Sequence, residues 1–266
     1  MLRAYAVLYI AVLYVPILFI VLFSFHSSAA LTFPFEGLSL RWYREALADP
    51  ALLDAFLNSV KVGLLTTLIT TVIGSMAALA FARIGGRLKK IFGFLSFAPI
   101  ALPGLFIGIS LLTLFSQLGM QRSLWTVTLS HVVITLPFFI ESCRSRLEFF
   151  DLSIEEAARD LGARPFTVFR LVTLPILAPT LIGAAILSFA ISFDEVIITV
   201  FVSGNQSTLP LYIWSMMRLS VTPLINATSV IAIASVILLV LAMSMILGLR
   251  RARARQQRHS RNTAHV

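Results

Sequence analysis

The chain has 266 residues, of which 58% are hydrophobic and only 12% are charged. Soluble domains contain about 25% charged residues, so this composition excludes an ordinary water-soluble protein and predicts a membrane protein. The net charge of +9 comes mainly from short arginine-containing segments beside apolar stretches, so it indicates membrane topology and not a nucleic-acid partner.

Six uncharged stretches are long enough to cross a membrane, because a bilayer core about 30 Å thick needs roughly 20 apolar residues in a helix. In chain order, the predicted spans cover residues 4–25, 62–82, 91–116, 123–143, 180–202 and 227–249. No repeat or linker separates them. The predicted fold is therefore an all-α membrane protein with six transmembrane helices in a single membrane domain, residues 1–266.

The first and third stretches each differ from a simple span of about 20 residues. The first is longer than the 7 to 15 apolar residues of a cleavable signal peptide, so we expect it to remain as an anchor. The third continues to Gln121 and contains Pro99, Pro103 and Gly104, which favour a bend, although ordinary helix packing also tolerates these residues.

The distribution of lysine and arginine predicts the orientation, because such residues in short loops stay on the cytoplasmic side. With the N-terminus inside, sixteen of the 21 lie in cytoplasmic segments and four in external ones, with Lys61 at a membrane edge. Both termini are therefore predicted to be cytoplasmic. The basic tail, residues 250–266, is expected to contact lipid headgroups, and Trp42 and Tyr43 are expected on a short helix at the outer interface.

The loop between the fourth and fifth spans contains the sequence Ser-Ile-Glu-Glu-Ala-Ala-Arg-Asp-Leu-Gly, residues 153–162. Ser153 and Glu156 have the spacing of a capping box, which predicts the start of a helix. Gly162 can adopt the left-handed conformation that ends a helix, and Pro165 fits the first turn of a second helix, residues 165–171. The loop is thus predicted to form a short cytoplasmic helix-turn-helix.

Ala157 and Ala158 leave one side of the first short helix nearly bare, so a partner protein can approach its backbone closely. From the spacing alone, a solvated connector is an equally good interpretation.

A resemblance to a known family favours the partner-binding interpretation. The pattern formed by Glu156, Ala157, Ala158, Gly162, Leu174 and Pro175 resembles the EAA loop of permease subunits of bacterial ATP-binding-cassette importers. Val172 stands where that family usually has isoleucine. The resemblance implies that the loop is a coupling helix, which lies in a cleft of a separate ATPase subunit and transmits nucleotide-driven motion to the spans.

A second resemblance covers most of the chain and points to the spermidine/putrescine permeases within that family. It rests on residues 40–43, 58–59, 192–196, 201–204, 209–213 and 221–227. It implies import of a small cationic nitrogen compound across a bacterial inner membrane; the alternative is another small solute, such as a phosphonate or an amino-acid derivative. The implied partners are a second permease copy or homologue, an ATPase dimer, an extracytoplasmic binding protein and membrane lipid.

Motifs for catalysis are missing from the sequence. It has no Gly-x-x-x-x-Gly-Lys-Ser/Thr loop, so we expect a partner to hydrolyse ATP and predict no cofactor. The four histidines are scattered, and neither His-Glu-x-x-His nor Gly-x-Ser-x-Gly occurs, which argues against an intramembrane enzyme. His131 is expected to form hydrogen bonds between helices. A stand-alone secondary transporter is a further alternative, but it has no reason to carry an EAA-like loop.

Asp194 and Glu195 lie inside the fifth predicted span, where a charged carboxylate costs about 2.5–3.5 kcal/mol at the centre of the bilayer. The helical wheel aligns Glu195 with Ser192 and Thr199 and favours it for a substrate pathway. The family resemblance favours Asp194 instead, and a helix broken near Phe193 would let both point inward. We expect the acids to attract a cationic ligand; the alternative is an ion pair with a basic residue of this chain or with the partner permease.

Overall fold

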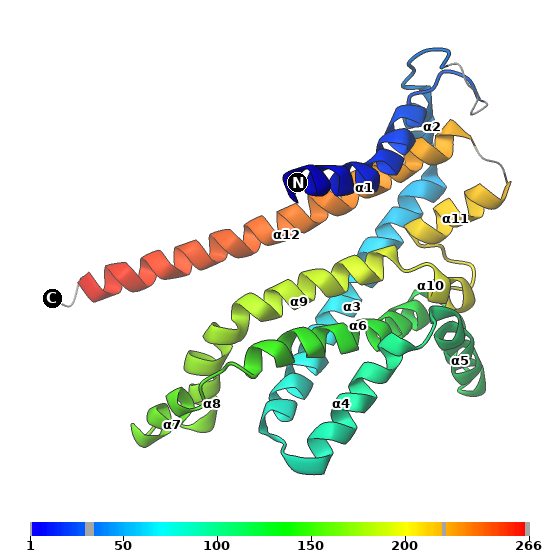
Figure 1. Ribbon diagram of the computed structural model, residues 1–266. Coiled ribbons are helices and arrows are strands. Elements are labelled where there is room, and N and C mark those ends of the chain that lie inside the picture. The colour runs from blue at the N-terminus through cyan, green and yellow to red at the C-terminus, as the bar shows by residue number, and fades with distance from the viewer. Residues whose placement is uncertain (1, 30–34, 220–221, 264–266) are drawn as a thin grey trace. The chain divides into compact units, whose positions relative to one another are not determined.

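The computed structural model describes residues 2–29, 35–219 and 222–263. Val221 of the motif at residues 221–227 and residues 264–266 of the basic tail lie outside this part. Figure 1 shows the helices, which are α1 (Leu2–Ser24), α2 (Arg41–Ala48), α3 (Pro50–Arg83), α4 (Gly86–Ala101), α5 (Gly104–Gln117), α6 (Leu124–Leu147), α7 (Ser153–Asp160), α8 (Pro165–Val168), the π-helix η1 (Phe169–Thr173), α9 (Leu174–Asp194), α10 (Ile197–Val202), α11 (Leu209–Leu219) and α12 (Pro223–Thr263).

The prediction of an all-helical membrane protein is confirmed. Five stretches of the described residues are helical, long and apolar enough to cross a membrane, and α4 with α5 makes a sixth if that bent pair counts as one span. The five are residues 5–24, 50–83, 124–147, 165–194 and 223–242. Each of them overlaps one of the predicted spans.

The third predicted span, 91–116, is bent and not straight. The chain turns by 103° between α4 and α5. Leu102 has the extended backbone angles φ −87° and ψ 135°, which a residue before proline favours because the ring of Pro103 disfavours the helical conformation there. The bend predicted from the prolines and glycines is therefore present, and its position follows from Pro103.

The fifth predicted span, 180–202, has different bounds in the structure. Its helix starts much earlier, because α8, η1 and α9 follow one another without a break from Pro165 to Asp194. The helix then ends at Asp194, and α10 begins only at Ile197. The two acids thus lie at a break in the helix and not in the middle of a continuous span.

The described chain divides into two compact units. The first comprises residues 1–59 and 206–239, and the second comprises residues 60–205 and 240–266. In the first unit, the indole Nε1 of Trp42 donates to the carbonyl oxygen of His26 over 2.7 Å, and Trp42 is buried. The predicted short helix is therefore present as α2, and Trp42 is buried against its own chain.

In the second unit, α6 packs against α9, α4, α10 and α5. Two glycines of α3 allow aromatic rings from neighbouring helices to approach its backbone. A Cβ atom at Gly63 would lie 2.8 Å from the ring of Phe189, and one at Gly74 would lie 2.5 Å from the ring of Phe139. Small residues at contacts of this kind are how membrane helices gain close van der Waals packing, because burial from lipid supplies little hydrophobic driving force.

Hydroxyl groups add polar contacts between α3 and α6. Oγ1 of Thr70 lies 2.9 Å from Oγ1 of Thr135, and Oγ1 of Thr66 donates to the carbonyl oxygen of Thr128 over 3.4 Å. All four threonines are buried. These contacts hold α3 and α6 in a fixed position relative to each other.

Candidate functional site

The predicted helix of the loop between spans four and five is present as α7, but its N-terminus is capped differently from the prediction. Ser153 is the first helical residue, and the backbone N–H of Ser153 donates to Oδ1 of Asp151 over 2.9 Å. No capping-box hydrogen bond from the side chain of Ser153 to Glu156 is present. The capping-box prediction is therefore wrong, because an acid two residues earlier satisfies the first free N–H.

The contact with Ser153 lowers the pKa of Asp151. Hydrogen bonds from the side chain and backbone of Ser153 hold the pKa of the exposed Asp151 carboxyl below its usual value. Because the pKa is lowered, the contribution of this cap is present at neutral pH and is lost as the pH falls through the lowered pKa.

The residues of the EAA-like pattern form the outward face of α7 and the turn after it. Glu156 and Ala157 are exposed, and Ala158 is half-buried. Gly162 has φ +85°, the left-handed conformation predicted for it, and a Cβ atom there would meet nothing within 4 Å. Pro165 is the first residue of α8, as predicted, although α8 continues into η1 and α9 and does not end at residue 171.

Glu155, and not Glu156, is the buried acid of α7, with an exposed fraction of only 2%. Its Oε1 accepts a hydrogen bond from Oγ1 of Thr173 over 2.5 Å. Its Oε2 accepts from Nη2 of Arg159 over 3.0 Å and from Nη2 of Arg83 over 3.3 Å. One carboxylate thus connects α7 to the last residue of α3 and the last residue of η1.

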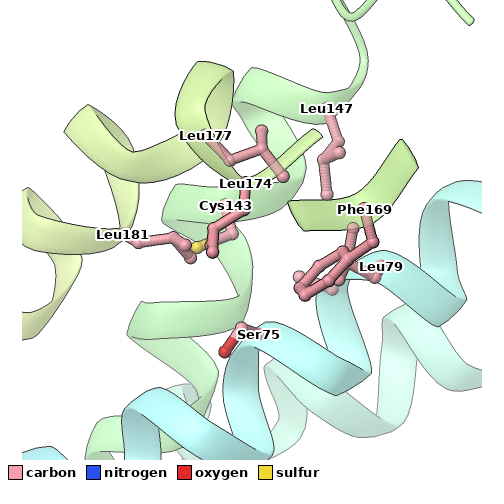
Figure 2. A pocket seen from close by; sticks show the side chains of 9 residues that line it. Ser75, Leu79, Cys143, Leu147, Phe169, Leu174, Leu177 and Leu181 are labelled. Atoms are coloured by element: carbon pink, nitrogen blue, oxygen red, sulfur yellow. The ribbon is translucent and has the colours of Figure 1, made fainter. Parts of the chain in front are cut away.

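Leu174 and Pro175, the end of the EAA-like pattern, form the first turn of α9. Pro175 is exposed, and Leu174 lines a small cavity of about 20 Å³ between α3, α6, η1 and α9. Figure 2 shows Leu174 and Phe169 at this cavity together with Cys143, the single cysteine of the chain. A volume of this size holds about one water-sized sphere.

The break between α9 and α10 separates the environments of the two predicted acids. Asp194 is the last residue of α9 and is exposed. Glu195 is half-buried, and its Oε1 accepts a hydrogen bond from the backbone N–H of Ile198 over 2.9 Å. The side chain of Glu195 therefore caps the start of α10, whereas Asp194 remains accessible.

His131 on α6 contacts both sides of this break. Its Nδ1 lies 2.8 Å from Oγ of Ser192 on α9, and its Nε2 lies 2.9 Å from Oγ1 of Thr199 on α10. The imidazole is completely buried. The predicted role of His131 in hydrogen bonding between helices is therefore confirmed, and Ser192 and Thr199 face α6 and not an open pathway.

The structure groups the predicted residues at the two ends of α9. Leu174 and Pro175 directly follow Thr173, which contacts Glu155 of α7, and Asp194 lies at the other end, about 30 Å away for a helix of this length. Sequence reasoning missed Asp151, Glu155 and their partners Arg83 and Thr173. The polar Thr173, directly before the apolar residues that begin α9, was the available signal.

Among the described residues, no group of three or more His, Cys, Asp or Glu side chains is placed to hold a metal ion. The arrangement consists of an exposed short helix, a buried ionic junction beneath it and a broken membrane helix.

Comparison with known proteins identifies the family. Residues 70–256 match the family described as binding-protein-dependent transport system inner membrane component. The spermidine/putrescine transport system permease protein PotC of Escherichia coli strain K12 is 35% identical over 243 residues, which cover 91% of this chain and 90% of PotC. The putrescine transport system permease protein PotI of the same strain is 37% identical over 227 residues, 82% of this chain and 80% of PotI.

A solved structure shares the fold. A chain of a bacterial ABC transporter involved in import of the acidic polysaccharide alginate superimposes with a TM-score of 0.73 at 17% identity, covering 91% of this chain and 94% of that one. The protein therefore belongs to the binding-protein-dependent transport system inner membrane components, multi-pass permease subunits of bacterial inner-membrane ABC importers whose ATPase is a separate subunit.

Proposed function

We propose that this permease imports a small cationic nitrogen compound of the polyamine type, such as spermidine or putrescine. The proposal is supported by the identity of 35% to PotC and 37% to PotI, whose names give spermidine and putrescine as their solutes. The charge distribution at the break in the fifth span adds an argument from the residues of this chain.

Asp194 carries this argument. The last carbonyl groups of a helix lack partners within the helix and give its C-terminus a partial negative charge. Asp194 adds a full negative charge at the C-terminus of α9, where its carboxylate is exposed. A carboxylate and a helix C-terminus at a break inside a membrane protein together attract a cation.

Glu195 does not serve the same purpose. Its carboxylate accepts the N–H of Ile198 and lies at the start of α10, where the helix has a partial positive charge. The negative charge of Glu195 is therefore largely balanced within the chain. We assign the cation-attracting role to Asp194 and a structural role to Glu195.

The proposal includes the orientation and the coupling role of α7. With both termini in the cytoplasm, α7 lies on the inner side, where an ATPase subunit binds. The exposed side chains of Glu156 and Ala157 then face that subunit, and Gly162 sets the turn that leads through η1 to Leu174 and Pro175. Ala158, which is half-buried, lies next to Ala157 and adds a second small side chain to this side of α7.

The proposed complex contains a second permease copy or homologue, an ATPase dimer and an extracytoplasmic binding protein in a lipid bilayer. Residues 5–23 of α1 are mostly apolar, and none of them is buried within the chain. Such a surface needs lipid or the partner permease to cover it.

Uptake of radiolabelled spermidine and putrescine tests the substrate assignment, in cells that lack other polyamine importers and express this complete importer. Asp194→Asn should lower uptake about tenfold, the effect of losing one charge-assisted contact. Asp54→Asn makes the same change at an exposed acid of α3 and should leave uptake at the parental level. Parental uptake by Asp194→Asn would refute the pathway role, and import of a phosphonate without spermidine would refute the polyamine assignment.

A further inference from the structure

The junction around Glu155 joins three parts of the second unit that are distant in the sequence. Glu155 lies on α7, Arg83 is the last residue of α3, and Thr173 is the last residue of η1. The three hydrogen bonds to the carboxylate span 2.5 to 3.3 Å. No other acid of α7 is buried, since Glu156 and Asp160 are exposed.

Burial of this carboxylate is costly unless its partners remain in place. Only 2% of the Glu155 side chain is exposed, so water cannot replace a lost partner without rearrangement. The guanidinium groups of Arg83 and Arg159 are about half exposed, with side-chain exposed fractions of 55% and 50%. The acid is therefore the fixed centre of the junction, and the two arginines approach it from the solvent side.

Thr173 connects the junction directly to the membrane helix. The residue after it, Leu174, begins α9, which is continuous as far as Asp194. α9 has 21 residues and is about 30 Å long, so a displacement at its start is carried along its hydrogen-bonded backbone. A displacement of Glu155 would therefore move Thr173 through their hydrogen bond, and α9 would carry that movement to Asp194.

The structure leaves space for such a displacement at the same point. Phe169 and Leu174, at the start of η1 and directly after its end, line the cavity of about 20 Å³ (Figure 2). Protein interiors are otherwise close-packed, so side chains beside a cavity can shift with little steric cost. The π-helical geometry of η1 is itself a feature that recurs at functional sites.

We propose that Glu155 is the positioning residue that transmits movement of α7 to α3 through Arg83 and to α9 through Thr173. This inference rests on the proposed coupling role of α7 and adds the intramolecular route that follows it. Glu156 and Glu155 then have different tasks. Glu156 faces the ATPase, whereas Glu155 faces inward and carries the movement to the membrane helices.

The decisive measurement is the amount of spermidine imported per ATP hydrolysed by the complete importer in proteoliposomes. Thr173→Val removes the hydroxyl donor but keeps the shape of the side chain, and Thr173→Ser keeps the donor. We expect Thr173→Val to lower the ratio about tenfold, as for loss of a hydrogen bond to a charged group, and Thr173→Ser to restore most of it. A parental ratio with Thr173→Val overturns the inference.

Glu155→Gln provides a second variant if Thr173→Val fails to assemble. It should lower the ratio while the ATPase subunit still co-purifies. Arg83→Ala should also lower it, and Arg87→Ala, with the same loss of charge at an exposed position, should not. A fall in ATP hydrolysis in proportion to transport would indicate a merely structural role and would overturn the inference.

Glu156→Gln and Gly162→Val separate this inference from the proposed function on which it rests. If both keep the parental ratio, the coupling role of α7 fails, and the inference about Glu155 fails with it. If both lower the ratio while Thr173→Val and Glu155→Gln do not, the coupling role stands and only the route through Glu155 is refuted.

Discussion

Nδ1 of His131 lies 2.8 Å from Oγ of Ser192, and the same ring reaches Thr199 beyond the break in the fifth span. Oγ1 of Thr199 donates to the carbonyl oxygen of Glu195 over 2.8 Å, so it accepts from Nε2–H of His131. Nδ1 then accepts from the hydroxyl of Ser192. These hydrogen bonds connect α6 to the end of α9 through Ser192 and to α10 through Thr199, on the two sides of the break.

His131→Phe keeps the ring but removes both hydrogen bonds. We expect the free energy of unfolding in mixed detergent micelles to fall by about 1–3 kcal/mol, because hydrogen bonds between membrane helices are individually modest. His131→Gln retains a donor and an acceptor and should lose less. Equal stability of His131→Phe and the parent would contradict the assigned role of the chain of hydrogen bonds.

Gly74 permits the contact between α3 and the buried ring of Phe139. A Cβ atom would lie 2.5 Å from Cδ1 of that ring, which is completely buried and cannot move away freely. Gly74→Ala should therefore lower the free energy of unfolding by about 1–3 kcal/mol, the usual cost of overpacking.

Gly183 on α9 is the matched control, because a Cβ atom there meets nothing within 4 Å. Gly183→Ala should leave stability unchanged or raise it by up to about 1 kcal/mol, since alanine favours the helix more than glycine does. The same thermal or detergent titration measures both variants, and an equal loss of stability in the two would rule out the packing explanation.

Gly162 is required for its backbone conformation and not for space, because its φ is +85° and a side chain there meets no atom within 4 Å. Valine in this conformation costs about 1–2 kcal/mol, and asparagine less. We expect Gly162→Val to reduce spermidine imported per ATP, with a smaller effect for Gly162→Asn.

Gly119, in the turn after α5, has φ +67° and also has open space around it. Gly119→Val therefore introduces the same backbone strain away from α7 and should keep the parental ratio of spermidine to ATP. If Gly119→Val and Gly162→Val reduced the ratio equally, strain in general would explain the result, and the turn after α7 would have no special role.

The orientation is testable with reporters. A reporter fused after Lys90 or at the C-terminus should be active as a cytoplasmic fusion, and one inserted near Asp49 as an extracytoplasmic fusion. This follows from the excess of lysine and arginine in the segments assigned to the inside. The opposite pattern of reporter activity would overturn the assignment of both termini and of α7 to the cytoplasm.

Apolar length predicted the helical membrane fold well, because a bilayer imposes the same requirement on every span. It predicted helix ends poorly. Apolar residues continue beyond Asp194 and Glu195, which placed the fifth span at 180–202, and nothing in the local sequence required α9 to continue backward through η1, past Pro175 and Pro179, to α8. Membrane helices tolerate interior proline where local π-helical geometry satisfies the freed backbone groups, and η1 directly precedes α9, so the prolines did not mark the boundary.

The two adjacent glutamates of α7 show where sequence reasoning reached its limit. Glu155 and Glu156 are chemically identical, and the family pattern directed attention to Glu156. Which one is buried depends on Arg83 and Thr173, which lie 72 and 18 residues away in the chain. Such contacts become visible only in three dimensions. The cap at Asp151 was missed for a different reason, since Ser153 offered an equally good local candidate.

The most direct test of the central claim is ATP-dependent uptake of labelled spermidine into proteoliposomes that contain this permease with its ATPase, partner permease and binding protein. We predict accumulation that requires ATP and the binding protein, that falls about tenfold with Asp194→Asn, and that is lost when the ATPase is omitted. Accumulation by the permease alone, driven by an ion gradient without ATP, or equal uptake by Asp194→Asn, would contradict this account.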